Sequence, residues 1–276
     1  MASGVVKKRL DLLLVERGLF PTRQRAQAAI MAGQVRVEGK KIEKPGERVP
    51  VTAEIEVSGP PLPYVSRGGV KLEEALRAFS LNVENKMALD VGASTGGFTD
   101  CLLKHGARKV YAVDVGYGQL AWSLRQDPRV VVMEKTNARD LSLEMLGERV
   151  DLATIDVSFI SLLKVLPAVL SCLKPGGDII ALVKPQFEAG RRQVGKGGVV
   201  KDPQVHKEVL LRIIEQGAAM GLNLHGLIPS PIRGPKGNIE FLLWWSCRGG
   251  GIEPPLWSQV VEKAVARGWQ GKYKGN

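Results

Sequence analysis

Apolar and polar residues repeat with a helical period in some parts of this chain and alternate strictly in others, which predicts its secondary structure. Near the N-terminus two segments with helical spacing come first, and two short alternating segments follow them. These are residues 8–17 and 22–33 for the helices, and 34–37 and 54–57 for the strands. Thr22 caps the second helix, Gly33 ends it, and Glu38-Gly39 forms a turn after the first strand. Residues 1–60 are therefore expected to form a small α+β domain.

A stretch rich in proline follows this domain and separates it from the rest of the chain. Ser58-Gly-Pro-Pro-Leu-Pro63 is stiff, and few contacts are expected to cross such a segment. We therefore predict a linker at 61–66, a second domain at 67–248 and a C-terminal extension at 249–276.

The second domain begins with a helical pattern and continues with apolar runs of strand length. Strands are expected at about 86–92, 109–114, 129–134, 150–156, 178–184, 222–229 and 238–246. Several of these runs are continuously apolar, which is typical of strands that helices cover on both faces. The pattern predicts a doubly wound, Rossmann-like α/β domain with a mostly parallel seven-stranded sheet and a ligand at the carboxyl ends of its strands.

The charge of the chain points to a polyanionic partner. Lysine and arginine outnumber aspartate and glutamate by 39 to 28, and the net charge of +11 favours contact with phosphates, so nucleic acid is the leading candidate. No apolar stretch reaches the roughly 18 residues that would span a bilayer, and no signal peptide is evident, so we expect a cytoplasmic protein without membrane contact. The three cysteines are far apart and lack histidines at metal-ligand spacing, so neither disulfides nor a metal site are expected.

A glycine-rich turn after the first strand of the second domain is the candidate cofactor site. Asp90-Val-Gly-Ala-Ser-Thr-Gly-Gly-Phe-Thr99 lets the backbone approach a ligand closely, and it lacks the lysine of a triphosphate-binding loop. Asp114 ends the second strand, where a carboxylate can accept both ribose hydroxyls of a bound nucleoside. Spacing alone also fits NAD. Asn137 is either a neighbour of the adenine ring or a helix cap.

Four charged residues stand where a sequence that only builds a core would not place them. Asp156 and Lys184 each end an apolar strand, and Glu240 lies inside an apolar run, where a carboxylate needs a buried partner or a functional reason. Lys71 begins the helix before the first strand and by itself would be an ordinary surface lysine. Strand order permitting, the charges of Asp156 and Lys184 point into the cofactor crevice.

In this order, Lys71, Asp156, Lys184 and Glu240 resemble the catalytic tetrad of FtsJ-like ribose 2′-O-methyltransferases. The sequence motifs around these residues are similar to those of the TlyA (haemolysin A) family, and the similarity covers nearly the whole chain. These motifs are SRGGVKL, DVGASTGGFTD, IDVSFISL, VKPQFE and GNIEF. The resemblance implies S-adenosylmethionine as cofactor, and as substrate a ribose of ribosomal RNA or ribosomal subunits, with cytidine as the nucleotide. The cofactor contacts expected are Asp90, Gly92, Ala93, Ser94, Thr95, Gly96, Gly97, Phe98, Asp114, Asn137, Ala138, Asp156 and Phe159.

The N-terminal words RLDLLLVERGLFPTRQRA, IMAGQVRVEGK and KPG resemble the α-L RNA-binding motif. Arginines in the first turn of the second helix combine positive charge with free backbone N–H groups, an arrangement suited to phosphate. Residues 184–201 are rich in cations and glycine, which predicts a mobile basic lid over the RNA or, alternatively, a plain surface loop. The RNA contacts expected are Arg9, Arg23, Arg25, Lys40, Lys41, Arg67, Arg191, Arg192 and Lys196.

The implied chemistry needs a proton acceptor, because an alkyl hydroxyl is a poor nucleophile. Lys184 is the candidate, since a neighbouring cation, Lys71, and partial burial favour its neutral amine. Asp156 and Glu240 are expected to orient the two lysines. A non-catalytic RNA-binding ribosome factor is the alternative function. A cytolysin would need an inserting segment or a secretion signal, and a pseudouridine synthase would share only the N-terminal module.

Overall fold

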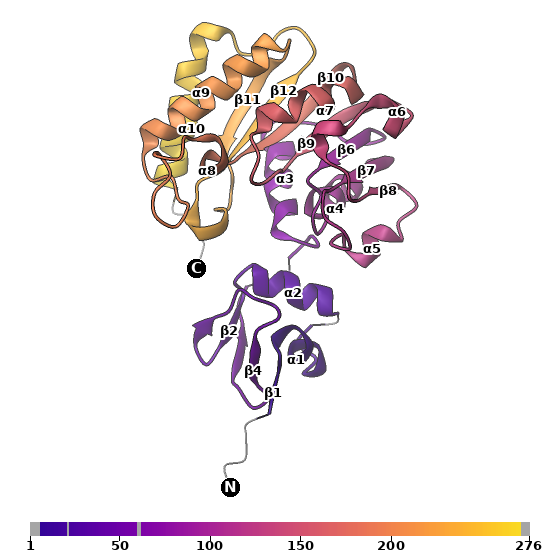
Figure 1. Ribbon diagram of the computed structural model, residues 1–276, viewed down its shortest axis with the longest axis vertical. Coiled ribbons are helices and arrows are strands. Elements are labelled where there is room, and N and C mark those ends of the chain that lie inside the picture. Colours follow the sequence, from indigo (N-terminus) through magenta and orange to yellow (C-terminus); the bar gives the residue numbers. More distant parts are fainter. Residues whose placement is uncertain (1–5, 21, 60–61, 272–276) are drawn as a thin grey trace.

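The computed structural model describes residues 6–20, 22–59 and 62–271, which form a small N-terminal lobe and a larger lobe (Figure 1). The predicted N-terminal domain, linker and C-terminal extension each include residues outside these ranges, namely 1–5, 21, 60–61 and 272–276. In the described part of the chain, no helix is long and apolar enough to cross a membrane.

The small lobe packs two helices against two small antiparallel sheets. Its elements are β1 (Lys7–Arg9), α1 (Leu10–Glu16), α2 (Arg23–Met31), β2 (Val35–Val37), β3 (Lys40–Lys41), β4 (Arg48–Pro50) and β5 (Ile55–Val57). β1 pairs with β4, and the second sheet has the order β3-β2-β5. Leu10, Leu14, Ile30 and Val35 are fully buried between them. The second helix and the strands at 35–37 and 55–57 are where the periodicity predicts them.

The first helix begins later than the sequence predicts, because residues 7–9 pair with β4 as a strand. That strand, β3 and β4 contain two or three residues each, too few for alternation to show. Thr22 caps α2 as expected, since its side chain accepts a hydrogen bond from the backbone N–H of Arg25 at 3.2 Å. The turn at Glu38-Gly39 has positive φ at both residues, as a two-residue hairpin requires.

The large lobe alternates strands and helices. Its strands are β6 (Met87–Val91), β7 (Lys109–Val113), β8 (Val130–Met133), β9 (Val150–Ile155), β10 (Leu173–Val183), β11 (Asn223–Pro229) and β12 (Phe241–Ser246). Its α-helices are α3 (Arg67–Ala78), α4 (Gly97–Lys104), α5 (Trp122–Arg125), α6 (Leu143–Leu146), α7 (Leu166–Cys172), α8 (Pro185–Glu188), α9 (Pro203–Ala219) and α10 (Trp257–Gln270). Short 3₁₀ turns lie at Ala138–Asp140, Leu162–Lys164, Pro235–Gly237 and Pro254–Leu256.

One seven-stranded sheet of order β11-β12-β10-β9-β6-β7-β8 runs through this lobe (Figure 1). β12 is antiparallel to both of its neighbours, and the other pairs are parallel. Apolar residues of α3, α4 and α5 cover one face, and those of α7, α9 and α10 cover the other. The doubly wound fold and the seven strands that the sequence predicts are confirmed. β10 starts early, at Leu173, with a register shift before Asp178.

The strand order fixes where a ligand binds. From β6 the chain proceeds to β7 on one side, and the later strand β9 pairs on the other side, so the connections diverge at the carboxyl ends of β6 and β9. Such a switch point opens a crevice in α/β sheets. Because β12 is antiparallel, with Phe241 opposite Val183, the residue before β12 lies at this same edge. Glu240 is therefore next to the strand and not inside it, which corrects the predicted start at 238.

Candidate active site

Two ion pairs assemble at the carboxyl edge of the sheet from four separate segments. Lys71 Nζ lies 2.6 Å from Glu240 Oε2, and Lys184 Nζ lies 2.5 Å from Asp156 Oδ1. The side chain of Glu240 is fully buried and that of Lys71 is 11% exposed. Each lysine thus has its own carboxylate partner. The sequence predicts that the two carboxylates orient the two lysines, and the fold determines the pairing.

The loop before β12 packs closely against the Glu240 carboxylate. A Cβ atom at Gly234 would lie only 2.0 Å from Glu240 Oε1, so the backbone passes directly over the carboxyl group. Among the described residues, Glu240 Oε1 has no hydrogen-bond partner, whereas Oε2 accepts from Lys71. Gly234 therefore holds the carboxylate by packing, a contact that the sequence did not indicate.

Two residues next to Lys184, Ser158 and Phe187, were not assigned a role from the sequence. The Lys184 ammonium donates to Ser158 Oγ at 2.9 Å and lies 6.0 Å from the ring centroid of Phe187. Phe187 in turn contacts Phe159, with ring centroids 4.8 Å apart. Phe159 is 90% exposed and has φ of 63°, and its predicted cofactor contact stays a prediction.

The glycines of the turn after β6 are required by the packing of the protein itself. A Cβ at Gly92, where φ is +85°, would lie 2.6 Å from the carbonyl oxygen of Asp156. At Gly97 it would lie 2.2 Å from Ser66 Oγ, where the start of α4 meets the start of α3. The turn therefore brings the cofactor loop, Asp156 and the helix that carries Lys71 together, whatever ligand it also accommodates.

Asp114 stabilises the same loop. Its carboxylate accepts hydrogen bonds from the backbone N–H of Ser94 at 2.8 Å and of Gly116 at 2.7 Å, and the side chain is half-buried. A carboxylate with one such bond at each oxygen retains lone pairs for ribose hydroxyls. Val115, which follows it, is 75% exposed and was not predicted. An apolar side chain that stands open beside this carboxylate is a candidate neighbour for a base.

Asp90 and Asn137 have internal partners. The Asp90 carboxylate is fully buried and accepts from Thr99 Oγ1 at 2.6 Å and Thr154 Oγ1 at 3.0 Å, so it joins α4 to β9 and this geometry does not support direct contact with a cofactor. Burial raises the pKa of Asp90 to about 6, although the two hydroxyls act against the rise. Asn137 Oδ1 accepts from the N–H of Arg139 and caps the 3₁₀ turn at Ala138–Asp140, in agreement with the capping alternative.

A cavity of about 1120 Å³ opens in front of Lys71, Asp156 and the glycine turn and extends between the two lobes. Predicted site residues that line it are Lys41, Arg67, Lys71, Gly92, Ala93, Ser94, Gly97, Phe98 and Asp156. The predicted catalytic and cofactor residues that do not line it are Asp90, Thr95, Gly96, Asp114, Asn137, Ala138, Phe159, Lys184 and Glu240. Its volume exceeds the roughly 300–1,000 Å³ of sites for small molecules, so it has room for more than a cofactor.

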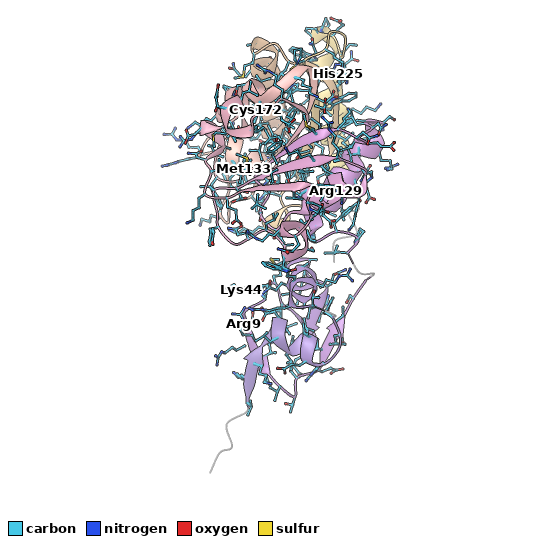
Figure 2. All side chains as sticks on the ribbon, turned by 90° about the vertical axis from the view of Figure 1, so that its right-hand side faces the viewer. Arg9, Lys44, Arg129, Met133, Cys172 and His225 are labelled. Carbon is cyan, nitrogen blue, oxygen red and sulfur yellow. The ribbon has the colours of Figure 1, made fainter. Side chains whose placement is uncertain are left out.

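In the small lobe, a buried carboxylate organises two of the predicted RNA-binding arginines. Asp11 accepts from Arg9 at 3.0 and 2.9 Å, from Arg23 at 2.9 Å and from Gln27 at 2.7 Å. Burial alone would raise the pKa of the Asp11 carboxyl, but these hydrogen bonds outweigh it and hold the pKa well below its usual range. The guanidinium groups remain about half exposed, and Figure 2 shows Arg9 on this lobe. Asp11 was not predicted from the sequence.

The other predicted RNA contacts are spread over both lobes. Arg25, Lys40 and Lys41 are exposed on the small lobe, and Arg191, Arg192 and Lys196 are exposed on the segment before α9. Arg67 lies in α3 and donates to the carbonyl oxygen of Arg233 at 3.4 Å. Their roles stay predictions. Within the described ranges, no group of three or more His, Cys, Asp or Glu side chains is arranged to hold a metal ion.

Comparison with known proteins identifies relatives for both lobes. Residues 64–247 match the family model of FtsJ-like methyltransferases, and residues 8–55 match the S4 domain. A Bacillus subtilis protein provisionally named rRNA methyltransferase YqxC is 56% identical over 90% of this chain and 88% of its own length. The protein of Mycobacterium tuberculosis named 16S/23S rRNA (cytidine-2′-O)-methyltransferase TlyA is 51% identical over 95% of this chain and 97% of its own. A solved structure from Streptococcus thermophilus that carries the provisional name hemolysin has a TM-score of 0.75 and 44% identity, covering 97% of this chain and 98% of that one.

Proposed function

Because this chain belongs to the FtsJ-like methyltransferase family, we propose that it transfers a methyl group from S-adenosylmethionine to a ribose 2′-hydroxyl of ribosomal RNA, and that the target is a cytidine. The name of the Mycobacterium tuberculosis relative supports both the substrate and the nucleotide. Ribosomal RNA as the substrate would place the reaction in the cytoplasm.

The observation that carries the proposal is the pair of ion pairs at the switch point. Lys71–Glu240 and Lys184–Asp156 join four distant segments at the edge where the glycine turn ends β6. Burying a carboxylate such as Glu240 in an apolar setting is unfavourable unless a charged partner compensates it, so a fold that needed only stability has no reason to build this arrangement.

The residues around the glycine turn fit S-adenosylmethionine. Asp114 would accept the ribose hydroxyls, Val115 would pack against the adenine, and the backbone of the turn would contact the amino-acid part. The cofactor supplies an electrophilic methyl group on a positively charged sulfur. The Asp156 carboxylate, half-buried at the same edge, provides a negative charge that favours a cation there.

Lys184 is the residue that we assign to the 2′-hydroxyl. As a neutral amine it would take the hydroxyl proton, and as an ammonium it would hold the ribose oxygen in place. Asp156 and Ser158 fix the position of its Nζ from two sides. Lys71 and Glu240 form the opposite part of the constellation and lie beside the loop that walls the cavity.

The small lobe would supply affinity for RNA. Its S4 domain presents Arg9 and Arg23 around Asp11, and Lys41 lines the cavity. An RNA backbone whose phosphates bind these residues would therefore run along the small lobe toward the ion pairs. Removal of residues 1–60 is expected to weaken RNA binding while the large lobe still binds cofactor. Methylation of intact subunits by the truncated chain at the full rate would contradict this division of labour.

A methyl-transfer assay tests the proposal directly. Purified protein is incubated with labelled S-adenosylmethionine and ribosomal subunits from cells that lack the modification, and the product is mapped by mass spectrometry of ribonuclease digests. Label on a ribose oxygen supports the proposal, with Lys184→Ala as the inactive control. Tight RNA binding without any transfer would favour a non-catalytic ribosome factor instead.

A further inference from the structure

One buried amide side chain fastens the basic segment before α9 to the strand entry that carries Glu240. Asn238 is 3% exposed. Its Oδ1 accepts from the backbone N–H of Val200 at 3.1 Å, and its Nδ2 donates to the carbonyl oxygen of Gly198 at 2.9 Å. The carboxamide therefore engages a donor and an acceptor two residues apart on a segment nearly forty residues away in sequence.

The segment that Asn238 holds has a turn at 190–193 and a tight hairpin turn at 195–199, and we call residues 190–200 the basic hairpin. The N–H of Gly195 donates to the carbonyl oxygen of Val199 at 3.0 Å, and the N–H of Gly198 donates to that of Gly195 at 3.0 Å. Lys196 is exposed at its tip, and Val200 is buried at its base. The base of the hairpin is thus anchored, while its cations face solvent.

The backbone of Asn238 acts on the other side, toward the ion pair. Its carbonyl oxygen accepts from the N–H of Gly234 at 2.9 Å and closes the loop that lies over the Glu240 carboxylate. The carbonyl oxygen of Glu240 accepts from the N–H of Ser230 at 2.8 Å. Contact by contact, the basic hairpin leads through Asn238 and the loop to Glu240, and from Glu240 to Lys71.

We propose that Asn238 is a positioning residue that couples RNA contact at the basic hairpin to the placement of the Lys71–Glu240 ion pair. The inference rests on the proposed methylation of RNA. A buried carboxamide with partners on both sides specifies one position of the hairpin, because sliding the hairpin by a residue would leave buried polar groups unpaired. RNA phosphates that bind the hairpin cations stabilise this one position, and Glu240 is then held against Lys71 when substrate is present.

Asn238→Asp is the most specific perturbation, since aspartate has the same shape. One oxygen still accepts from Val200, whereas the other faces the carbonyl oxygen of Gly198 and replaces a hydrogen bond by repulsion. Asn223→Asp is the matched control, because Asn223 also donates to a carbonyl, that of Arg248 at 2.8 Å, and does not line the large cavity. The wild-type chain is assayed first, and failure of the wild type to methylate RNA would refute the proposed function and not the coupling.

The test is a double-mutant cycle in single-turnover methyl transfer at saturating RNA and cofactor. Asn238→Asp is made in the natural chain and in a chain whose hairpin cations Arg191, Arg192 and Lys196 are replaced by alanine. We expect a loss of roughly tenfold or more in the natural chain, a loss of under about threefold in the hairpin variant, and no loss with Asn223→Asp. Cofactor affinity is expected to stay unchanged, because the glycine turn is not in this chain of contacts.

A purely structural role for Asn238 would give the same factor in both backgrounds, and that result would overturn the proposal. Wild-type rates in Asn238→Asp would overturn it as well. Should Asn238→Asp fail to fold by circular dichroism, Asn238→Ala removes both side-chain hydrogen bonds without adding charge and takes its place in the same cycle.

Discussion

Replacing Gly234 by alanine is expected to break the Lys71–Glu240 ion pair while leaving all four charged side chains in the protein. A Cβ at this position would lie 2.0 Å from Glu240 Oε1 and 2.5 Å from its Cδ. Real Cβ atoms essentially never come closer than 3.0 Å, so the carboxylate or the loop must move by about 1 Å. Since Lys71 and Glu240 join at 2.6 Å in a buried place, a movement of this size disrupts their hydrogen bond.

The expected magnitude follows from this displacement. A misplacement of about 1 Å at an active site lowers a rate by roughly 100-fold, or about 3 kcal/mol in the activation barrier. We therefore expect single-turnover methyl transfer by Gly234→Ala to fall by roughly 100-fold. Affinity for S-adenosylmethionine is expected to change little, because a Cβ at Gly234 would clash with Glu240 and with none of the residues of the glycine turn or Asp114.

Single-turnover transfer to ribosomal subunits measures the rate, and calorimetry measures the affinity for the cofactor. Urea unfolding measures the free energy of unfolding and shows whether the variant is folded. Gly249→Ala is the control, since Gly249 has an ordinary φ and a Cβ added there would have nothing within 4 Å, and it is expected to behave as wild type. A fully folded Gly234→Ala protein with a wild-type rate would refute the reasoning, because the ion pair would then tolerate the displacement or have no part in the reaction.

Four further predictions follow from individual side chains. Lys184→Ala is expected to lower single-turnover transfer by about 10²- to 10⁴-fold with cofactor affinity intact, and a wild-type rate with RNA bound would remove Lys184 from the mechanism. Asp114→Ala is expected to weaken S-adenosylmethionine binding by roughly 10- to 100-fold in calorimetry, and unchanged affinity would contradict the ribose contact. Asp11→Asn is expected to lower the free energy of unfolding by about 1–3 kcal/mol and to weaken RNA binding in a filter assay, because Arg9 and Arg23 lose their charged hydrogen-bond acceptor. Unchanged stability together with unchanged RNA affinity would contradict this role of Asp11. Burial lowers the pKa of His206 to about 4, so the folded state resists protonation and this residue removes about 3 kcal/mol of stability as the pH falls from 6.5 to 4. Urea unfolding of the wild type and of His206→Gln at several pH values measures this loss of stability. A stability difference between the two proteins that does not change with pH would exclude the effect.

The pattern along the chain was sufficient for the strands and for two members of the site. Continuous apolar runs report burial on both faces, and burial is a property of each segment by itself, so all seven strands of the large sheet could be predicted. Asp156 and Lys184 could be placed at the carboxyl edge because each follows its strand directly. In the small lobe, β2 and β5 lie in alternating segments and could be predicted, whereas β1, β3 and β4 show no such alternation and could not.

Tertiary structure decided which charges meet and which polar groups face inward. Lys71 and Glu240 are 169 positions apart, and they pair only because β12 runs antiparallel beside β10 and brings Glu240 to the carboxyl edge. The sequence could equally place Asp90 in the crevice, yet its carboxylate turns to two threonines inside the lobe. The roles of Asn238 and Asp11 could be recognised only from their hydrogen-bond partners on other elements. Periodicity records how deeply a residue is buried, whereas strand order and register choose its neighbours, and the chemistry of this site depends on the neighbours.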